Sequence, residues 1–323
     1  MAILDNAYYQ PGDQQNWQGR IDGTEQVFLR WHQVVDAIDL SNEQSLAGAF
    51  VVLGFCCEEG VRRNQGRIGA KEGPAAFRKV LTGLPVHFSD TTRLIDAGDV
   101  ICLNEKLEEA QDCLHAAVSK IISMGGFPVL LGGGHEITYP HYLGIQTATK
   151  QSVGIINLDA HLDIRPLVAG KGNSGTGFYQ IAQHTEQENL PFHYLAIGIQ
   201  EISNTKALFD YADAKGVEII QAKDIYTERL GEIIDQIIDF GKKVDQVYLT
   251  IDLDAFAAAY APGVSALAFN GIVPDHNFQL IFETIIQLPN LCSIDIAELN
   301  PRYDIDNRTT KLGADLLFKL LQK

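Results

Sequence analysis

Long apolar runs are missing from this sequence, and basic side chains are scarce in it. Lys and Arg number 25 against 41 Asp and Glu, which gives a formal net charge of -16 at pH 7. A chain this acidic is poorly suited to binding nucleic acid or an anionic membrane surface. Without an apolar stretch of about 20 residues or a signal-like N-terminus, we expect neither a membrane-spanning helix nor secretion. These absences favour a soluble globular protein of the cytoplasm.

Cysteine is too sparse to build a disulfide scaffold or a thiolate metal site. The chain has 5 cysteines, none at the spacing of a metal motif. An odd number in a chain without secretory features indicates reduced thiols. The sequence also lacks Pro/Ser-rich linkers, repeats and low-complexity segments. We therefore expect one catalytic domain over residues 1–323, in which the polar residues 1–25 form an irregular N-terminal arm.

Short apolar runs alternate with amphipathic stretches along most of the chain. Buried strands are expected at residues 49–56, 93–101, 128–131, 153–158, 192–199, 217–221, 246–254 and 291–296. Helical spacing of apolar residues predicts helices at residues 25–40, 105–125, 203–215, 227–242, 274–288 and 308–321. Another helix is expected to begin at Pro74. The alternation favours an α/β fold with one parallel sheet covered on both faces, and a TIM barrel is the main alternative.

The stretch VGIINLDAHLD at 153–163 places three potential metal ligands after a buried strand. Asp159, His161 and Asp163 are two residues apart, so in extended geometry their side chains share one face. Ligands of open α/β sheets bind beyond the carboxyl ends of strands, where these residues fall. Two carboxylates and an imidazole gathered there destabilise the fold unless a positive charge lies between them. A divalent cation is the simplest such charge.

A second acidic pair and a further histidine follow other strands. Asp252 and Asp254 end the strand at 246–254, and His135 follows glycines at a strand-to-helix turn. Four carboxylates with two imidazoles exceed the ligand set of one catalytic zinc but fit two cations such as manganese. Two such cations lower the pKa of bound water and so generate a nucleophile near neutral pH. The sequence has no G-x-S-x-G motif that would indicate a serine nucleophile, so metal-dependent hydrolysis is the expected reaction class. The alternative is that the acids are helix caps or surface residues and that His135 is structural.

Two Gly-rich loops carry the basic and polar residues that an anionic substrate requires. The candidate substrate-binding residues are Arg62, Arg63 and Arg67 in the first loop, and Arg165, Asn173 and Ser174 in the second. Arginine binds carboxylates in a bidentate manner, so either loop can hold a substrate carboxylate. The alternative for both is a solvated surface loop. His141 and His184 are expected to be surface or capping residues.

Five motifs occur together: GGGHE at 132–136, DAHLD at 159–163, SGTGF at 174–178, DLDAF with APGVSA at 252–266, and AELNP at 297–301. In this combination the chain resembles the arginase/agmatinase/formimidoylglutamase superfamily of dimanganese ureohydrolases. The resemblance implies a three-layer α-β-α sandwich with a mostly parallel eight-stranded sheet. It also implies two Mn²⁺ ions per subunit, whose ligands are His135, Asp159, His161, Asp163, Asp252 and Asp254. Glu298 matches the glutamate that holds the amidine or guanidine group, and Asp163 matches the residue that passes a proton.

Departures from the arginase pattern indicate the substrate class. Gly134 stands where arginases and agmatinases usually carry Asp, and Ala257 and Ala258 replace their Asp-Pro. Arg165 stands in place of an Asn. The chain is therefore more similar to the formimidoylglutamase group, which cleaves N-formimidoyl-L-glutamate to glutamate and formamide in histidine degradation. The two carboxylates of that anionic amidine agree with the arginine loops.

Two alternatives to this activity stay open. One is a ureohydrolase that acts on a guanidino acid such as guanidinobutyrate, and the other is a non-catalytic metal-binding relative. Family members are often multimers, which leaves a homo-oligomer open as well.

Overall fold

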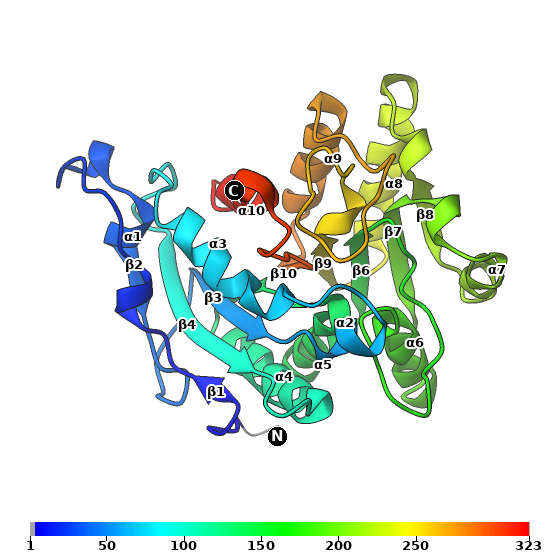
Figure 1. Cartoon of the computed structure of the whole chain (residues 1–323), viewed down its shortest axis with the longest axis horizontal. Helices are drawn as coiled ribbons and strands as arrows, with labels where there is room; N and C mark the ends of the chain where they lie inside the picture. Colours follow the sequence, from blue (N-terminus) through cyan, green and yellow to red (C-terminus); the bar gives the residue numbers. More distant parts are fainter. Residues whose placement is uncertain (1–3, 323) are drawn as a thin grey trace.

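One open sheet forms the centre of the computed structural model, which describes residues 4–322 (Figure 1). Its strands, in spatial order, are β1 (Tyr9–Gln10), β4 (Arg93–Ile101), β3 (Ala49–Cys56), β5 (Phe127–Leu131), β10 (Leu291–Ala297), β9 (Gln246–Asp252), β6 (Val153–Leu158), β7 (His193–Ile199) and β8 (Glu218–Gln221), with β2 (Val35–Ala37) beside β4. Neighbouring strands run parallel, except that β1 is antiparallel to β4. The sheet does not close on itself, so the alternative of a TIM barrel is wrong.

Helices lie on both faces of the sheet and complete three layers (Figure 1). One layer consists of α3 (Gly73–Leu81), α8 (Leu230–Lys242), α9 (His276–Ile286) and α10 (Arg308–Leu320). The other consists of α4 (Leu107–Ser123), α5 (Thr138–Thr149), α6 (Gly177–Gln187) and α7 (Lys206–Ala214). The helices α1 (Trp31–Val34) and α2 (Glu59–Arg63) are short. No helix within residues 4–322 is long and apolar enough to cross a membrane.

Single-turn 3-10 helices connect many of these elements. They are η1 (Gln14–Asn16), η2 (Gln26–Phe28), η3 (Ala70–Glu72), η4 (His135–Ile137), η5 (Glu201–Ser203), η6 (Ala222–Asp224), η7 (Thr227–Arg229), η8 (Leu253–Ala255) and η9 (Ile305–Asn307). Two of them carry residues of the predicted metal site: η8 directly follows β9, and η4 follows β5 after three intervening residues.

The central strands are buried on both faces, as their continuous apolar runs predict. In β6 all residues are buried. Ile156 and Leu158 join the core that contains α8 and α9, whereas Ile155 joins the core that contains α4 and α5. The predicted three-layer α-β-α sandwich is therefore confirmed. All eight predicted strands are present, and β1 and β2 extend the sheet beside β4.

The prediction of a helix over residues 25–40 is wrong. This segment contains η2, the four-residue helix α1 and the strand β2. In β2, Val35 lies opposite Leu94 and Asp36 lies opposite Ile95 of β4. Pairing with β4 satisfies the backbone groups of residues 35–37, and β-branched Val35 suits a strand. Tertiary pairing therefore outweighs the helical spacing of apolar residues.

The N-terminal segment packs against the sheet beside β4, the strand with which β2 also pairs. The Tyr9 hydroxyl donates to the Ala97 carbonyl at 2.8 Å, and Trp17 Nε1 donates to Asp96 Oδ2 at 2.6 Å. Apart from β1 and η1, residues 4–25 lack regular structure. Residues 1–3 of the predicted arm lie outside the described part of the chain.

Candidate metal centre

The predicted metal ligands follow three strands, and Glu298 follows a fourth; the four strands are neighbours in the sheet. The strands β5, β10, β9 and β6 lie side by side and run parallel. His135 follows β5, Asp159 follows β6, Asp252 ends β9 and Glu298 follows β10. The carboxyl ends of parallel strands share one edge of the sheet, so these side chains meet although the sequence separates them widely.

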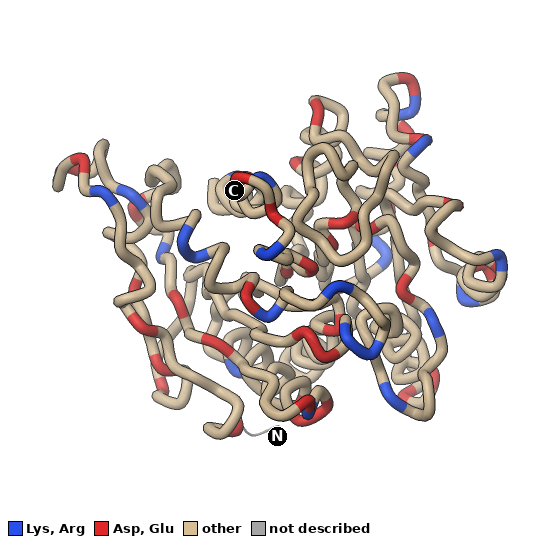
Figure 2. The backbone as a smooth tube through the Cα atoms, in the orientation of Figure 1, with Lys and Arg blue, Asp and Glu red and all other residues tan. Residues whose placement is uncertain are grey.

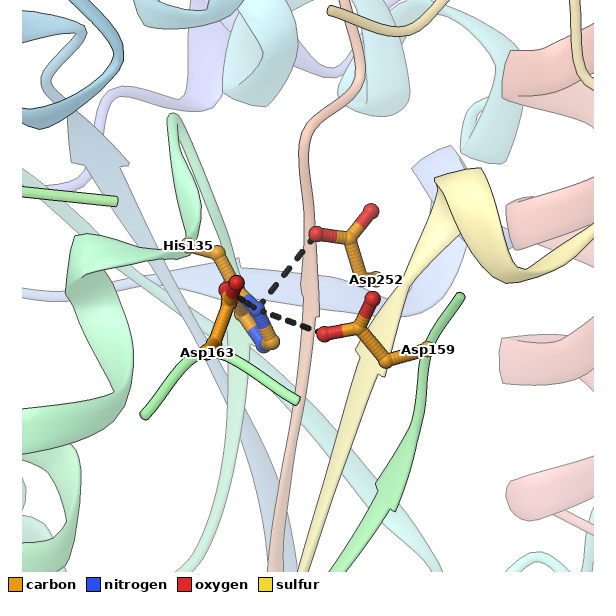
Figure 3. A group of neighbouring side chains, drawn as sticks. All are labelled: His135, Asp159, Asp163 and Asp252. Carbon is orange, nitrogen blue, oxygen red and sulfur yellow. Dashed lines mark hydrogen bonds and ion pairs between the residues drawn. The ribbon is translucent and has the colours of Figure 1, made fainter. Parts of the chain in front are cut away.

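Three carboxylates surround one nitrogen of His135 (Figure 3). Nδ1 lies 2.9 Å from Asp163 Oδ2, 3.3 Å from Asp159 Oδ2 and 3.4 Å from Asp252 Oδ2. Ligand atoms of these residues all lie within 4.8 Å of one another. One nitrogen and three carboxylate oxygens at such distances provide a donor set for one divalent cation.

A second cluster shares a residue with the first. His161 Nδ1 lies 3.1 Å from Asp254 Oδ2 and 3.5 Å from Asp159 Oδ1. Asp159 thus directs Oδ2 toward His135 and Oδ1 toward His161. A carboxylate with one oxygen in each cluster can bridge two cations, which lie about 3.5–4 Å apart in two-metal sites.

Two of the carboxylate residues at this site have an unusual backbone conformation. Asp163 has a φ of 48° and Glu298 a φ of 66°, both in the left-handed region that side chains other than glycine rarely adopt. The Glu298 backbone is held by an N–H donated to the Gly133 carbonyl at 2.8 Å. Positions of this kind cost about 1–3 kcal/mol each and gather at functional sites.

Burial and mutual repulsion shift the pKa values of the cluster strongly. Burial raises the pKa of Asp252 well above its usual range, and repulsion by Asp254 and Asp159 raises it further. Burial also raises the pKa of Asp254 to about 6, against the opposing effect of His161. Burial opposes charge on Asp159 too, but hydrogen bonds from His135 and His161 outweigh it and lower the pKa. The site is therefore short of positive charge, which divalent cations would supply.

The donor chemistry fits two hard or borderline cations. The six side chains offer imidazole nitrogen and carboxylate oxygen, the combination that manganese accepts. Asp254 Oδ1 is buried and has no hydrogen-bond partner among the described residues, so it is available as a further ligand atom. All six predicted ligands are thus brought together in two adjoining clusters.

Glu298 lies beside the clusters with one oxygen engaged and one free. Oε1 accepts the His135 backbone N–H at 2.9 Å, while the buried Oε2 has no partner among residues 4–322. Burial raises the pKa of Glu298 to about 8, and repulsion by Glu136 adds to the shift. A cationic group placed at Oε2 would restore the charged carboxylate.

A cavity of about 340 Å³ opens above the clusters. Its lining residues are Asn64, Gln65, Gly66, Arg67, His161, Asp163, Arg165, Ser174, Asp252, Asp254, Ser265, Ala266 and Glu298. Acidic residues line the metal side, whereas the two arginines and the hydroxyl and amide groups come from the surrounding loops. The cavity thus combines cation sites with neighbouring positive charge.

Residues 48–322 match the arginase family. The chain belongs to the arginase family. It is 41% identical over 323 residues to the formimidoylglutamase of Clostridium tetani, covering 97% of this chain and 95% of the relative. It is 42% identical over 310 residues to that of Chromobacterium violaceum, covering 95% and 97%. The predicted superfamily resemblance is thereby confirmed.

Solved structures of the arginase family share the fold of this chain. The formiminoglutamase of Trypanosoma cruzi, determined with Mn²⁺, aligns with a TM-score of 0.76 and 27% identity over 88% of this chain and 95% of that one. The formimidoylglutamase of Bacillus subtilis aligns with a TM-score of 0.78 over 94% and 95%. Its sequence identity of 23% supports the fold alone.

The two arginines of helix α2 lie outside the lining of this cavity. Arg62 forms ion pairs with Glu59 at 2.6 Å and with Glu105 at 3.2 Å. Arg63 pairs with Glu59 at 2.8 Å and with Glu108 at 2.6 Å. The juxtaposed red and blue segments near α2 are visible in Figure 2. The positive charge of these two side chains is thus offset locally.

The arginines that do line the cavity differ in how they are held. Arg67 Nε donates to the Ser265 carbonyl at 3.0 Å, Nη2 donates to Val264, and the guanidinium lies 4.1 Å from the Tyr303 ring centroid. Arg165 is exposed, and its side chain has no hydrogen bond or ion pair to any residue in the described part of the chain. Arg165 is therefore the guanidinium that is available to a ligand.

Of the two remaining candidates in the second loop, one lines the cavity and the other does not. Ser174 lines the cavity, and its hydroxyl accepts from Asn64 Nδ2 at 3.1 Å. Asn173 lies outside the cavity lining, and its Oδ1 accepts the Gly175 N–H at 2.8 Å to form the loop. Two further lining residues were not among the predicted site residues: Ser265, which lies in the APGVSA motif, and Asn64, which lies between Arg63 and Arg67 of the first Gly-rich loop.

The expectation that His141 is a surface or capping residue is wrong. His141 is fully buried, with Nδ1 2.7 Å from Asp295 Oδ2 and Nε2 2.5 Å from Ser293 Oγ. His141 lies on helix α5, which packs against the sheet, and its ring contacts polar residues that β10 presents to that helix. A polar residue inside a strand is the sequence signal that points to such a partner.

Proposed function

We propose that this chain hydrolyses N-formimidoyl-L-glutamate to L-glutamate and formamide with two Mn²⁺ ions per subunit. The observation that carries the proposal is the pair of clusters joined at Asp159 beneath a cavity with the free guanidinium of Arg165. An amidine with carboxylate groups matches a site that offers metal ligands, a buried carboxylate and a cation side by side. The formimidoylglutamases that are about 40% identical over nearly the whole chain support the same choice.

Two groups of residues would hold the cations. His135, Asp163 and Asp252 would hold one, His161 and Asp254 the other, and Asp159 would contact both. When bound, the cations supply Lewis acidity that makes water nucleophilic near neutral pH. Asp163, which belongs to the first of these groups, also lines the cavity, so its carboxylate can receive the proton that the attacking water loses.

Glu298 would bind the reacting end of the substrate. Its free Oε2 can pair with the amidinium nitrogens, which fixes the electrophilic carbon toward the metal side of the cavity. The hydrogen bond from the His135 backbone holds the other oxygen at 2.9 Å and keeps the carboxylate from turning. Glu298 therefore acts in substrate orientation.

Arg165 and Ser174 would bind the carboxylate end. A guanidinium forms bidentate hydrogen bonds with a carboxylate, and the Ser174 hydroxyl beside Asn64 offers a further donor. Arg67, held by the 264–265 carbonyls, would shape the wall and add positive charge. The ion-paired Arg62 and Arg63 are the weaker candidates for substrate contact.

A guanidino acid is the second candidate substrate. It carries one carboxylate, and among the described residues that line the cavity only Arg165 offers a guanidinium without an internal partner.

Cytoplasmic location and assembly into a homo-oligomer are part of the proposal; the acidic composition and reduced cysteines support the former.

Product analysis tests the proposal. The Mn²⁺-loaded protein would be offered formimidoylglutamate, arginine, agmatine and guanidinobutyrate in parallel, with formamide, urea and ammonia measured. We expect formamide and glutamate from the first substrate alone. Urea from guanidinobutyrate would favour the second candidate, and no product from any substrate would indicate a non-catalytic relative.

A further inference from the structure

A buried chain of hydrogen bonds leads from the metal centre into strands β9 and β10 of the sheet. His135 directs Nδ1 toward the carboxylates of the first cluster (Figure 3), while its Nε2 lies 2.9 Å from Thr250 Oγ1. Thr250 Oγ1 in turn donates to Asp295 Oδ1 at 2.7 Å. Thr250 and Asp295 are register partners on β9 and β10, and both are fully buried.

The second oxygen of Asp295 is also engaged. Oδ2 accepts the Tyr248 hydroxyl and lies 2.7 Å from His141 Nδ1. Asp295 thus accepts the hydroxyl protons of Thr250 and Tyr248, and an ionised carboxylate acts only as an acceptor. Because Asp295 can only accept, the Thr250 hydroxyl must donate to it.

That direction settles which nitrogen of His135 carries a fixed proton. Thr250 has one hydroxyl proton, and Asp295 accepts it. The lone pair of Thr250 Oγ1 must then accept a proton from His135 Nε2. A proton on Nε2 leaves Nδ1, the nitrogen that faces Asp163, as the one that can bind a cation.

We infer that Thr250 and Asp295 are positioning residues that fix the Nε2 proton of His135 and thereby strengthen one of the two cation sites selectively. Partners that hydrogen-bond a metal-binding histidine from behind are typically worth about 10–100-fold in metal affinity. The inference rests on the part of the proposed function that concerns cation binding. It does not depend on which amidine is hydrolysed.

The second cluster provides an internal reference. His161 contacts Asp159 and Asp254, whereas the hydroxyl of Thr250 is hydrogen-bonded to His135 and Asp295. Loss of that hydroxyl should therefore weaken the site that contains His135 and leave the site that contains His161 close to its original affinity.

Three variants and a control test this link. Thr250→Val keeps the shape of the side chain and removes the hydroxyl, Thr250→Ser keeps the hydroxyl, and Asp295→Asn replaces an oxygen acceptor with an amide that can donate. Thr185→Val is the matched control, because Thr185 is buried but its hydroxyl donates to the helix carbonyl of Ala182 at 3.0 Å. Mn²⁺ stoichiometry and the dissociation constant of each site would be measured without substrate by equilibrium dialysis, and paired or isolated Mn²⁺ by electron paramagnetic resonance.

We expect Thr250→Val to bind one Mn²⁺, seen as an isolated ion, at concentrations where the parent, Thr250→Ser and Thr185→Val bind a coupled pair. The weaker site should lose about 10–100-fold in affinity, and Asp295→Asn should weaken the same site. Asp295→Asn carries the test alone if Thr250→Val does not fold in thermal melts without metal. Two sites of parental affinity in Thr250→Val, equal weakening of both sites, or a Thr250→Ser as weak as Thr250→Val would each overturn the inference. A failed substrate proposal would leave these measurements unchanged.

Discussion

The backbone N–H of His135 donates to Glu298 Oε1 at 2.9 Å, across 163 positions of the sequence. This bond joins the segment that presents a metal ligand to the carboxylate that faces the cavity. The spacing between the candidate metal centre and Glu298 is therefore set by the pairing of β5 with β10, and not by a flexible loop.

Replacing Glu298 by Gln should impair turnover without releasing the cations. The amide keeps the size of the side chain but cannot pair as an anion with an amidinium, and hydrogen bonds to charged groups are worth about 1.5–3 kcal/mol. We expect a fall of about 10–100-fold in kcat/KM with unchanged Mn²⁺ stoichiometry. Steady-state kinetics and metal analysis on the same preparation check this, and loss of Mn²⁺ would instead assign Glu298 to metal binding.

The exposed Arg165 should govern affinity for the carboxylate end of the substrate. For Arg165→Ala we expect KM to rise by about 10–100-fold, because a charge-assisted hydrogen-bonded pair is lost. Arg62→Ala is the comparison, since that guanidinium already pairs with Glu59 and Glu105. Equal effects of the two substitutions on KM would contradict the assignment of the available cation.

The shared carboxylate predicts a difference in metal stoichiometry between two variants. Asp159→Asn removes a charge from both clusters, so we expect both cations to be lost at micromolar Mn²⁺. Asp254→Asn affects only the cluster of His161 and should leave about one cation bound. Equilibrium dialysis with metal analysis distinguishes these outcomes, and one retained cation in Asp159→Asn would show that this carboxylate does not bridge.

The metal-free protein should lose stability as the pH rises. The pKa of Glu298 is raised from 4.5 to about 8 in the fold, so between these values the folded state binds more protons than the unfolded chain. Stability therefore falls with rising pH over this window, and the raised pKa of Asp254, about 6, acts in the same direction above 3.8. Thermal melts in chelator should show a lower Tm at pH 8 than at pH 5. Added Mn²⁺ should reduce that difference, and a Tm that rises with pH in chelator would be the contrary result.

Residue spacing was sufficient to predict the sheet and the meeting of the six candidate metal ligands. Buried parallel strands must be apolar, so their runs stand out, and polar residues directly after them must meet at one edge. Asp159, His161, Asp252 and Asp254 follow this rule, and each lies in one of the two clusters. The single-domain organisation over residues 1–323 stays a prediction.

The rest of the site depended on contacts that spacing does not encode. Arg62 and Arg67 look alike in the sequence, but Arg62 has acidic neighbours from its own helix and from Glu105, whereas Arg67 is bound by carbonyls near Ser265. The burial of His141 is not evident from local spacing, because its partner Asp295 lies 154 positions away on a buried strand. Long-range partners decide whether a polar side chain faces solvent, a ligand or the core.

The contact between Arg67 and Ser265 has a consequence for how the enzyme acquires its binding cavity. It joins positions 198 residues apart, and the hydroxyl of Ser265 also receives the Arg67 backbone N–H at 2.9 Å. Contacts of such high sequence separation form late, after the loop between them has been closed by other structure. The first arginine loop therefore reaches its working position only after the segment around Ser265 has been synthesised and folded onto the sheet. An amino-terminal folding intermediate would carry the sequence of that loop without the contacts that hold Arg67 in place.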